Sequence, residues 1–433
     1  MDTQTDVVVI GAGVIGSSIA LELARHGRQV VCVDAGPAAG AGSTSSSSAI
    51  IRFSYSTLDA VLTAWEAAPM WSDWESHLGV RDPDGMVRFI RTGMMLIDTP
   101  DFVDTRITDL WDDVGIRYER WNAADIARRC PQLDVGAYYP PKSVDDPAFA
   151  DDANGEISAI FEPLSGFVDD PMLAARNLAF AARHHGATFR FRSEVVEVLH
   201  ADGHVAGVRL AGGDTVGAPI VVNVAGPHSS ALNRLAGVTG DMRIRHRPLR
   251  QEVFAVPAPA GFDLDNGTPM VCDLDLGQYF RPQVGGTLLV GGTEPACDEL
   301  EWVDDPDRYD DHTTVEKFET TMYRLARRLP EFGVPHRPVG LAALYDVADD
   351  WVPIYDGSSL PGWFMACATS GNQFKNAPIA GQFMRTIIDA AEAGHDHDTH
   401  PVRFTGARTG RSIDLGAFSR RRDPAYTSGT VMG

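Results

Sequence analysis

The sequence predicts a two-domain α/β protein, in which one domain is assembled from separate stretches of the chain and the other is β-rich and built on an antiparallel sheet. At 433 residues, the chain exceeds the size at which a single core usually stops growing. Its first 34 residues read as strand, helix and strand, and a buried strand followed by a helix returns near residue 365. The stretch 245–295 instead alternates short β runs with turns. The second domain therefore interrupts the first.

The N-terminal unit has the pattern of a β-α-β motif. Residues 6–11, DVVVIG, form a continuous apolar run, which is typical of a strand buried on both faces. Apolar side chains then recur at helical spacing as far as Gly27, which stands where a helix C-cap is expected. A second β run, QVVCVD, closes the unit at Asp34.

Three glycines in the pattern G-x-G-x-x-G join the first strand to the helix. Gly11 permits a tight turn, Gly13 lets the backbone approach a pyrophosphate, and Gly16 lets helix and strand pack closely. The helix start supplies N–H groups for the phosphates, and Asp34, at the end of the second strand, can accept from ribose hydroxyls. This context predicts a Rossmann-type unit that binds FAD or NAD. Its predicted contacts are Gly11, Gly13, Val14, Ile15, Gly16 and Asp34.

Clear helix-capping and turn residues after residue 165 indicate that the chain returns to the first domain. Asp170 and Pro171 suit a helix N-cap and first turn. Residues 188–199 are expected to form one strand, which two more strands follow across glycine-containing turns. A later helix is expected to begin with a capping box at Thr313. The predicted segments are 1–85, 165–230 and 335–400 for the Rossmann-type domain, 86–164 and 231–334 for the β-rich domain, and 401–433 for a surface-wrapping tail.

Composition argues against several classes of function. A formal net charge of -22 opposes binding to nucleic acid or to an anionic membrane, because both require a basic surface. No apolar stretch approaches the ~20 residues that span a bilayer, and the acidic start lacks the basic region of a signal peptide. The five cysteines are scattered and form no CxxC pair, so neither a disulfide framework nor a metal site is expected. We expect a cytoplasmic protein.

Four segments carry a family resemblance: the β-α-β unit, the small-residue loop ending in AIIR, the runs RSEVVEV and VVNVAGPHS, and SGNQFKNAP near the end. In this order they resemble the FAD-dependent amine oxidoreductases, the family of D-amino-acid oxidase, glycine oxidase, sarcosine oxidase and dimethylglycine dehydrogenase. The runs IIR and SGxxFK are most similar to the sarcosine oxidase branch. The resemblance implies that the Rossmann-type domain binds FAD and that the β-rich domain carries the substrate.

The resemblance also implies FAD contacts outside the β-α-β unit. The Ser-rich loop at residues 35–48, which by composition alone is a flexible linker, becomes a cofactor loop. The helix after residue 376 would direct its positive end towards the flavin. The additional contacts implied by the family are Ser45, Ser46, Ser48, Val195, Ala225, Gly226, Gly371, Asn372, Gln373, Phe374 and Lys375.

Three residues match the family's substrate site. Arg52 and Lys375 match the pair that holds the substrate carboxylate over the flavin, where arginine offers a planar fork and lysine a point charge. On its own, an arginine after two isoleucines is more simply a strand residue whose head reaches solvent. Tyr279 matches a tyrosine that lines the substrate pocket, with core packing as the alternative. Asn372 and Gln373 depart from the sarcosine branch, which leaves the exact substrate open.

Two absences bear on the cofactor. Covalent members of the family attach flavin through a cysteine near the position of Ala343 or a histidine in the N-terminal loop, and this chain has neither, so we expect non-covalent FAD. The sarcosine branch also places a lysine above the flavin, where its charge helps O2 accept electrons. The matching strand at 287–292 has no lysine. We therefore expect reduced flavin to react slowly with O2. The expected electron acceptor is O2 or an unidentified dye or protein.

The expected reaction passes a hydride to FAD from the carbon beside the nitrogen of a small amine or of an N-methylated or cyclic amino acid, leaving an imine. A FAD-dependent 2-hydroxy-acid oxidoreductase would use the same fold, but it needs a base, typically histidine, near the flavin. His228 is more simply a structural residue. An NAD-linked dehydrogenase and a non-catalytic flavin-carrying subunit are also compatible with the β-α-β unit.

Overall fold

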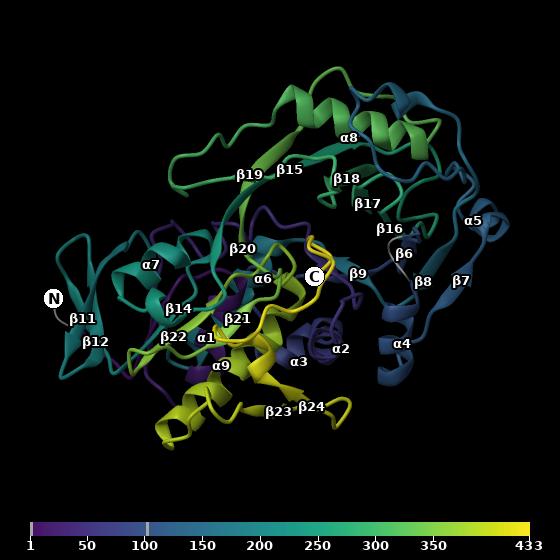
Figure 1. Ribbon diagram of the computed structural model, residues 1–433. Helices are drawn as coiled ribbons and strands as arrows, with labels where there is room; N and C mark the ends of the chain where they lie inside the picture. The colour runs from purple at the N-terminus through teal and green to yellow at the C-terminus, as the bar shows by residue number, and fades with distance from the viewer. Residues whose placement is uncertain (1–2, 101–103) are drawn as a thin grey trace.

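The structure, a computed structural model, describes residues 3–100 and 104–433. A six-stranded sheet with the order β10-β3-β2-β14-β22-β21 combines strands from the N-terminal part of the chain with strands from its C-terminal part (Figure 1). Its neighbours pair in parallel, except that β21 is antiparallel to β22. The strands are β2 (Val7–Ile10), β3 (Val30–Val33), β10 (Thr188–Arg190), β14 (Ile220–Asn223), β21 (Ile354–Asp356) and β22 (Trp363–Cys367).

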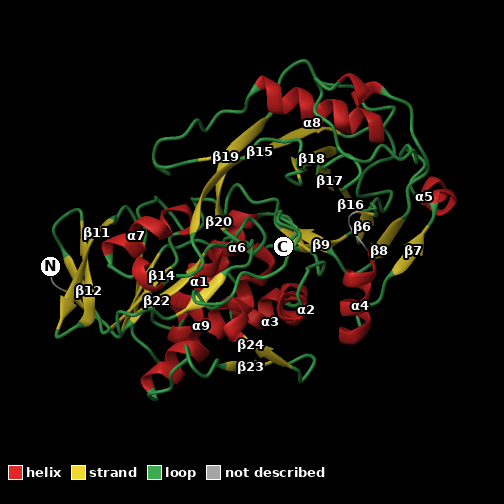
Figure 2. Cartoon of the chain, in the orientation of Figure 1, coloured by secondary structure: helices red, strands yellow, loops and turns green. Residues whose placement is uncertain are grey.

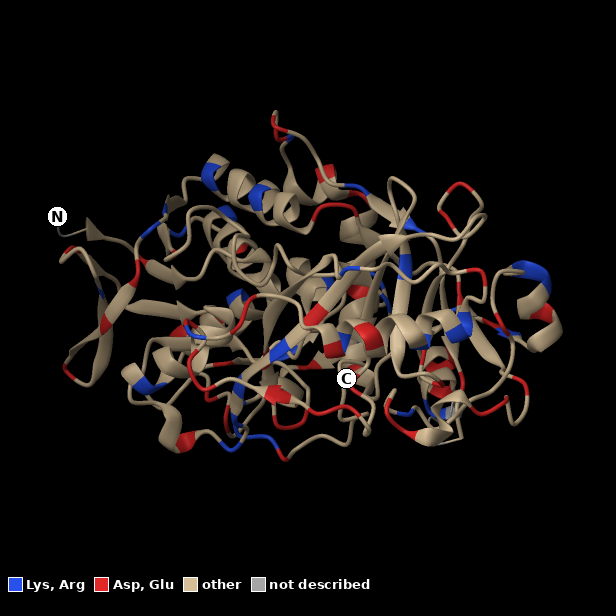
Figure 3. Ribbon diagram, turned by 90° about the horizontal axis from the view of Figure 1, so that it is seen from above, with Lys and Arg blue, Asp and Glu red and all other residues tan. Residues whose placement is uncertain are grey.

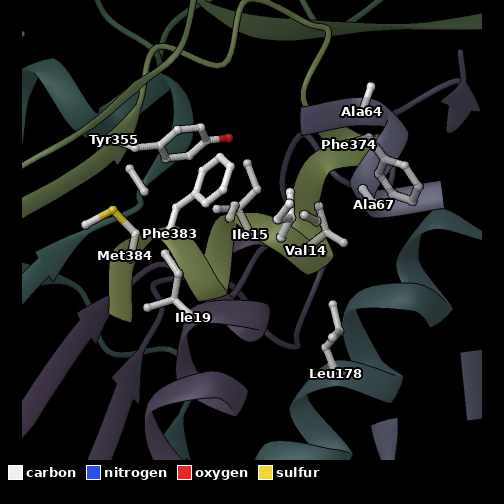
Figure 4. Close-up of a cluster of buried hydrophobic side chains, with 14 of the residues drawn as sticks. Val14, Ile15, Ile19, Ala64, Ala67, Leu178, Tyr355, Phe374, Phe383 and Met384 are labelled. Carbon is white, nitrogen blue, oxygen red and sulfur yellow. The ribbon is translucent and has the colours of Figure 1, made fainter. Parts of the chain in front are cut away.

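Helices cover one face of this sheet. Figure 4 shows Ile19 of α1 beside Phe383 and Met384 of α9, and all three side chains are buried. Val7 and Val9 of β2 belong to the same apolar cluster. The α1 helix packs between α6 and α9, and Gly381 of α9 lets Ser18 of α1 approach closely. The helices of this layer are α1 (Val14–Arg25), α2 (Leu58–Ser72), α6 (Pro171–His184) and α9 (Ala377–Glu392).

A second, smaller sheet covers the opposite face. Val8 and Ile10, which alternate with the helix-facing valines of β2, pack with side chains of this sheet and of α7. Burial on both faces explains why β2 is apolar at every position. The sheet has the order β1-β13-β12-β11. Its elements are β1 (Thr3–Gln4), β11 (Val195–Ala201), β12 (His204–Leu210) and β13 (Thr215–Gly217), and α7 spans Ser229–Leu235.

The third sheet has the strand order β19-β15-β18-β17-β16-β6-β8-β7, with β20 pairing with β15 (Figure 2). Its pairs are antiparallel apart from β16 and β6. One face packs under α8 (Val315–Arg328), whose Phe318, Met322 and Leu325 are buried against it. The strands are β6 (Met94–Ile97), β7 (Glu119–Trp121), β8 (Ala159–Glu162), β15 (His246–Pro257), β16 (Met270–Asp273), β17 (Gln278–Gln283), β18 (Thr287–Gly292), β19 (Glu301–Trp302) and β20 (Gly340–Ala348).

Short elements complete the described chain. The sheet β4-β9-β5 brings the residues around Arg52 beside Gly166 and Phe167. These elements are β4 (Ile50–Ile51), β5 (Phe89–Arg91), β9 (Gly166–Val168), β23 (Arg403–Thr405), β24 (Ser412–Asp414), α3 (Trp74–Leu78), α4 (Asp104–Val114), α5 (Ala123–Arg129) and the 3-10 turns η1 (Pro147–Ala150), η2 (Gly226–His228), η3 (Thr239–Asp241), η4 (Phe374–Asn376) and η5 (Leu415–Phe418).

The architecture confirms the expected α/β class and corrects three local expectations. Residues 188–199 form two strands in different sheets, because Arg192 adopts φ +50° and turns the chain between β10 and β11. Thr314, one residue after Thr313, caps α8 by accepting a hydrogen bond from the Lys317 N–H. The stretch 401–433 does not simply wrap the surface, since Ile413 and Leu415 are fully buried.

Charge is dispersed over this fold. Figure 3 shows acidic residues in loops around the whole outline of the chain. Among residues 3–100 and 104–433, no helix is both long and apolar enough to cross a bilayer.

Candidate active site

A cavity of about 1090 Å³ begins at the carboxyl ends of the central strands, where Ile10, Val33 and Val224 line it. It continues to the β4 segment and to the loop before α9. Ligands of open α/β sheets bind at this edge, because the loops that leave neighbouring strands diverge there. The volume exceeds the range of about 300–1,000 Å³ for ordinary small-molecule sites, which suits a long ligand together with a second molecule.

The glycine-rich turn at one end has no room for side chains at two of its three glycines. Gly11 adopts φ +109°, and a Cβ at this position would lie 2.3 Å from the Val224 carbonyl oxygen. A Cβ at Gly16 would lie 1.9 Å from the Gly11 carbonyl oxygen. At Gly13 the nearest atom, the Thr44 Oγ1, would be 3.1 Å away. The first and third glycines therefore form the tight turn and the helix contact, and the second faces the cavity.

Hydrogen bonds to neighbouring polar side chains fix the conformation of this turn beside the cavity. The Ala12 and Gly36 N–H groups each donate to the carboxylate of Asp34 at 2.6 Å. The Val14 N–H donates to the Thr44 Oγ1 at 3.1 Å, while Gly13 provides no side-chain cap for α1. Thr44 was not predicted, although it lies next to the predicted serines.

The predicted serines of the cofactor loop differ in position. Ser46 and Ser48 line the cavity, whereas the Ser45 hydroxyl donates back to the Gly42 carbonyl at 2.9 Å, and Ser45 does not line it. The Ser48 hydroxyl lies 2.6 Å from the Tyr279 hydroxyl, which joins the loop to β17. The other sequence-predicted FAD residues also line the cavity: Gly11, Gly13, Val14, Ile15, Gly16, Asp34, Val195, Ala225, Gly226, Gly371, Asn372, Gln373, Phe374 and Lys375.

The loop before α9 is held in an unusual backbone conformation. Ala368, Ser370 and Gly371 all have positive φ angles, between 49° and 68°. Asp346 of β20 fixes the start of this loop, because its carboxylate accepts from the Ala368 N–H and from His246 Nδ1, both at 2.6 Å. Burial opposes a charge on His246, but this carboxylate outweighs it and raises the pKa of His246 well above its ordinary value.

Arg52 and Lys375, which are separated by most of the chain, meet on the ring of Tyr55. The Arg52 guanidinium lies 4.8 Å and the Lys375 Nζ 4.9 Å from the ring centroid. Lys375 donates to the Tyr55 hydroxyl at 2.8 Å and to the Asn372 carbonyl at 2.6 Å. The Trp71 Nε1–H donates to the Lys375 carbonyl at 2.7 Å. Tyr55 was not predicted, although it follows Arg52 by three residues in FSYS.

These two cations are buried without an acidic partner. Both side chains are less than a tenth exposed, and neither forms an ion pair anywhere in residues 3–100 and 104–433. Burial, and then the charge of Arg52, lower the pKa of Lys375 well below its ordinary value. An anion placed between them would relieve both penalties, because buried charges are stable when they are paired.

The segment 428–433 covers Arg52. The Arg52 Nη2–H donates to the Val431 carbonyl at 2.7 Å and to the Met432 carbonyl at 3.1 Å. Both residues line the cavity. The Val431 N–H donates in turn to the Glu294 carboxylate at 3.0 Å. Sequence reasoning found neither the segment nor Glu294, because their sequences carry no motif.

Aromatic side chains form the wall between the two ends. Tyr279 and Tyr345 line the cavity, and the Tyr345 ring packs so closely on Gly371 that a Cβ there would lie 2.4 Å from it. Burial raises the pKa of Tyr279 to about 12. Arg281 lies behind this wall, 3.9 Å from the Phe167 ring centroid, and donates to the Ser48 carbonyl at 3.1 Å.

The residues at the glycine end fit a dinucleotide. Gly13 leaves the backbone open to the cavity, α1 begins there without a side-chain cap, and Asp34 lies at the adjacent strand end. The fold and the cavity thus define a dinucleotide-binding protein whose cavity continues to a second site with two buried basic side chains.

A family comparison makes this class specific. Residues 6–386 match the family model described as DAO: FAD dependent oxidoreductase, so the chain belongs to this family. FAD is therefore its cofactor, the predicted family resemblance is confirmed, and the NAD-linked dehydrogenase is set aside.

Individual relatives are distant but cover most of the chain. It is 24% identical to the glycine oxidase of Geobacillus kaustophilus over 403 residues, which is 92% of this chain and 96% of the relative. It is 24% identical to the D-amino acid dehydrogenase of Methylobacterium radiotolerans, covering 66% of this chain and 76% of the relative. The crystal structure of L-proline dehydrogenase from P. horikoshii aligns with a TM-score of 0.76 at 20% identity, over 98% of both chains. This structural likeness confirms the fold.

Proposed function

We propose that the protein oxidises the carbon–nitrogen bond of a small amino acid, N-methylated or cyclic, to an imine, and that Arg52 and Lys375 hold the substrate carboxylate. The observation that carries the proposal is a pair of buried cations without an acidic partner on the wall of a FAD-sized cavity. The named activities of the glycine oxidase, the D-amino acid dehydrogenase and the L-proline dehydrogenase support the substrate class.

The chain's own residues position the substrate. When bound, FAD takes up a hydride from the carbon beside the substrate nitrogen. Ser54 holds the Nη1 of Arg52, and the Nη2 is directed at the segment 428–433. Lys375 adds a charge fixed by Tyr55 and by the Asn372 carbonyl. This fixed geometry limits the orientations of the substrate and so favours transfer from one carbon. Tyr279 and Tyr345 add aromatic surface to the cavity wall.

Two substrates that differ in the carboxylate test the clamp. Replacing Arg52 or Lys375 with methionine should lower kcat/KM for proline by about ten- to a hundredfold, since a charge-assisted contact contributes about 1.5–3 kcal/mol. The loss for pyrrolidine, which lacks the carboxylate, should be much smaller. Arg81→Met is the control, because Arg81 pairs with Glu75 on the surface. Equal losses for both substrates would make the two residues structural.

No observation favours a 2-hydroxy-acid substrate. Within the described chain, the histidine on the cavity wall is His228, which is about half-exposed and lies 2.9 Å from Asp307. It neighbours Ala225 and Gly226 at the dinucleotide end rather than Arg52. A base for an alcohol would be needed near the substrate.

We propose further that FAD is bound non-covalently, because position 343 is alanine and the loop 35–48 contains no histidine. Acid precipitation should release the yellow flavin into the supernatant. A pellet that stays yellow after washing would contradict this proposal.

We also propose a cytoplasmic location, since all five cysteines are free thiols, as is usual in a reducing compartment. The electron acceptor proposed is a dye-like or protein acceptor rather than O2, on the grounds that β18 carries no lysine.

A further inference from the structure

The backbone of Val431 lies between Arg52, which lines the cavity, and Glu294, which lies outside the cavity lining. Its N–H donates to the Glu294 carboxylate at 3.0 Å, and its carbonyl oxygen accepts from Arg52 at 2.7 Å. The atoms between them, N–Cα–C–O, are also the skeleton of an α-amino acid. Figure 1 shows the C-terminus in the middle of the molecule, near β9 and β20. Val431 and Met432, just before it, line the cavity.

Glu294 has the properties of a binding residue rather than of a surface acid. It adopts φ +51°, a conformation that non-glycine residues take rarely and mostly where the surroundings enforce it. Burial raises its pKa to about 8. Within the described residues, its carboxylate forms no ion pair, and the Val431 N–H is the hydrogen-bond donor that it meets.

The segment is anchored at its base through a buried ion pair and at its tip through backbone groups. Arg422 forms a buried bidentate pair with Asp350, whose carboxylate and carbonyl also receive the Ala425 N–H and the Thr427 hydroxyl. Beyond Thr427, the chain turns at Gly429 with φ +68°. At the tip, Arg52 donates to the neutral carbonyls of Val431 and Met432, which form weaker hydrogen bonds to a cation than a carboxylate does. The Ser56 hydroxyl also donates to the Gly433 oxygen at 2.6 Å, and this bond must break when the tip leaves.

We propose that Val431 stands in for the substrate: the segment 428–433 leaves Arg52 and Glu294 when an amino acid enters, and Glu294 then accepts a hydrogen bond from the substrate's amino group. This inference rests on the proposed function, because it takes Arg52 as the carboxylate site. It adds a second recognition point, so that amino acids are distinguished from simple carboxylic acids. Replacing the segment with the substrate is favourable, because Arg52 then binds a carboxylate instead of a neutral backbone carbonyl.

Three molecules of similar size separate the two contacts: proline, cyclopentanecarboxylate without the amine, and pyrrolidine without the carboxylate. Binding is followed anaerobically through the flavin absorbance and through hydrogen–deuterium exchange of the peptide that contains Val431 and Met432. In the full chain, cyclopentanecarboxylate should raise exchange in this peptide. Deleting residues 428–433, which leaves the Asp350 anchor intact, should tighten its binding by about tenfold. Tyr426→Ala, at an exposed residue just before the segment 428–433, should change neither result.

Exchange that falls or stays constant, or a deletion that weakens or does not change binding, would show that the segment is part of the ligand's binding wall and overturn the proposal. Glu294→Gln in the shortened chain should weaken the binding of proline by about tenfold and leave the binding of cyclopentanecarboxylate unchanged. Equal effects on both ligands, or none on proline, would remove Glu294 from amine recognition. Glu299→Gln is the matched control, because Glu299 is exposed on the same loop.

Arg52→Met in the shortened chain separates this inference from the proposed function. If cyclopentanecarboxylate fails to bind, or binds equally well without Arg52, the carboxylate site itself is wrong and the inference falls with it. If the ligand binds through Arg52 but the segment's exchange does not rise, only the displacement is wrong.

Discussion

The two ends of the cavity are built by different means. At the dinucleotide end, Gly11, Asp34 and Thr44 are close in sequence and act largely on backbone groups. At the substrate end, Arg52 meets Lys375 from a distant part of the chain, and the charges are those of side chains. The first end depends on the absence of side chains and the second on their charge. Substitutions should therefore act sterically at one end and electrostatically at the other.

The largest effect is expected at Gly16. In Gly16→Ala, the new Cβ would lie 1.9 Å from a backbone oxygen, which cannot move without separating α1 from β2. We expect purified protein without flavin, or no folded protein, as measured by the visible flavin absorbance per chain and by circular dichroism.

Gly13→Ala is the matched control within the same motif. Its Cβ would meet the Thr44 side chain at 3.1 Å, and a side chain can rotate away. It should therefore fold with native circular dichroism, although its Cβ faces the space expected for the pyrophosphate and lowers flavin retention. Loss of native circular dichroism in both variants would show that the contact between α1 and β2 does not distinguish the two glycines.

A smaller loss is expected for Asp34→Ala. This change removes the acceptor of the Ala12 and Gly36 N–H groups together with the proposed ribose contact. A charge-assisted hydrogen bond contributes about 1.5–3 kcal/mol, so FAD should bind about ten- to a hundredfold more weakly. Titration of the apoprotein with FAD measures this, and unchanged affinity would reduce Asp34 to a strand-end carboxylate.

The substrate end should respond to pH through Lys375. Because its pKa is lowered, Lys375 loses its proton at a lower pH than an ordinary lysine, and a bound carboxylate favours the protonated form. Affinity for cyclopentanecarboxylate should therefore be constant below this pKa and fall above it, by at most about tenfold per pH unit. Titrations from about pH 6 to about pH 10 follow the effect.

Lys375→Met distinguishes this ionisation from that of Glu294, whose pKa is about 8. The variant should bind the ligand weakly and lose the part of the pH dependence that comes from Lys375. A pH profile that is the same in both proteins would assign the titration to another group.

The smallest effect is expected for reoxidation by O2. A fixed positive charge near reduced flavin stabilises a superoxide-like state, and β18 offers Leu288, Leu289 and Val290 rather than a lysine. Arg281 supplies a charge behind Ser48, although burial lowers its pKa to about 10. We expect slow reoxidation in stopped-flow experiments and a further decrease of a few-fold in Arg281→Met. Reoxidation that keeps pace with turnover would make the protein an oxidase and refute the argument from the missing lysine.

The dinucleotide end of the cavity could be predicted from local sequence patterns, whereas the substrate end could not. The glycine motif and Asp34 were recognisable because they are adjacent to a strand and a helix that the hydrophobic pattern indicates. Arg52 and Lys375 were recognised only through family resemblance, since no local pattern relates residues so far apart. Tyr55, Thr44 and Glu294 were missed because their roles depend on which atoms the folded chain brings near them.

Misplaced boundaries have an equally physical origin. The pattern at 188–199 contains alternating β-forming residues throughout, and only the φ of +50° at Arg192 divides it between two sheets. Thr313 and Thr314 are both good N-cap residues, so the local sequence could not choose between them.

By itself, the sequence determined the fold class, the β-α-β unit and its glycine turn, because these depend on hydrophobic periodicity and on backbone sterics within a few turns of chain. The tertiary structure alone decided that Arg52 and Lys375 share the ring of Tyr55, and that Val431 lies between Arg52 and Glu294. Such contacts join residues that no short-range preference connects. They form because buried charges and N–H groups must find partners wherever the completed fold places them.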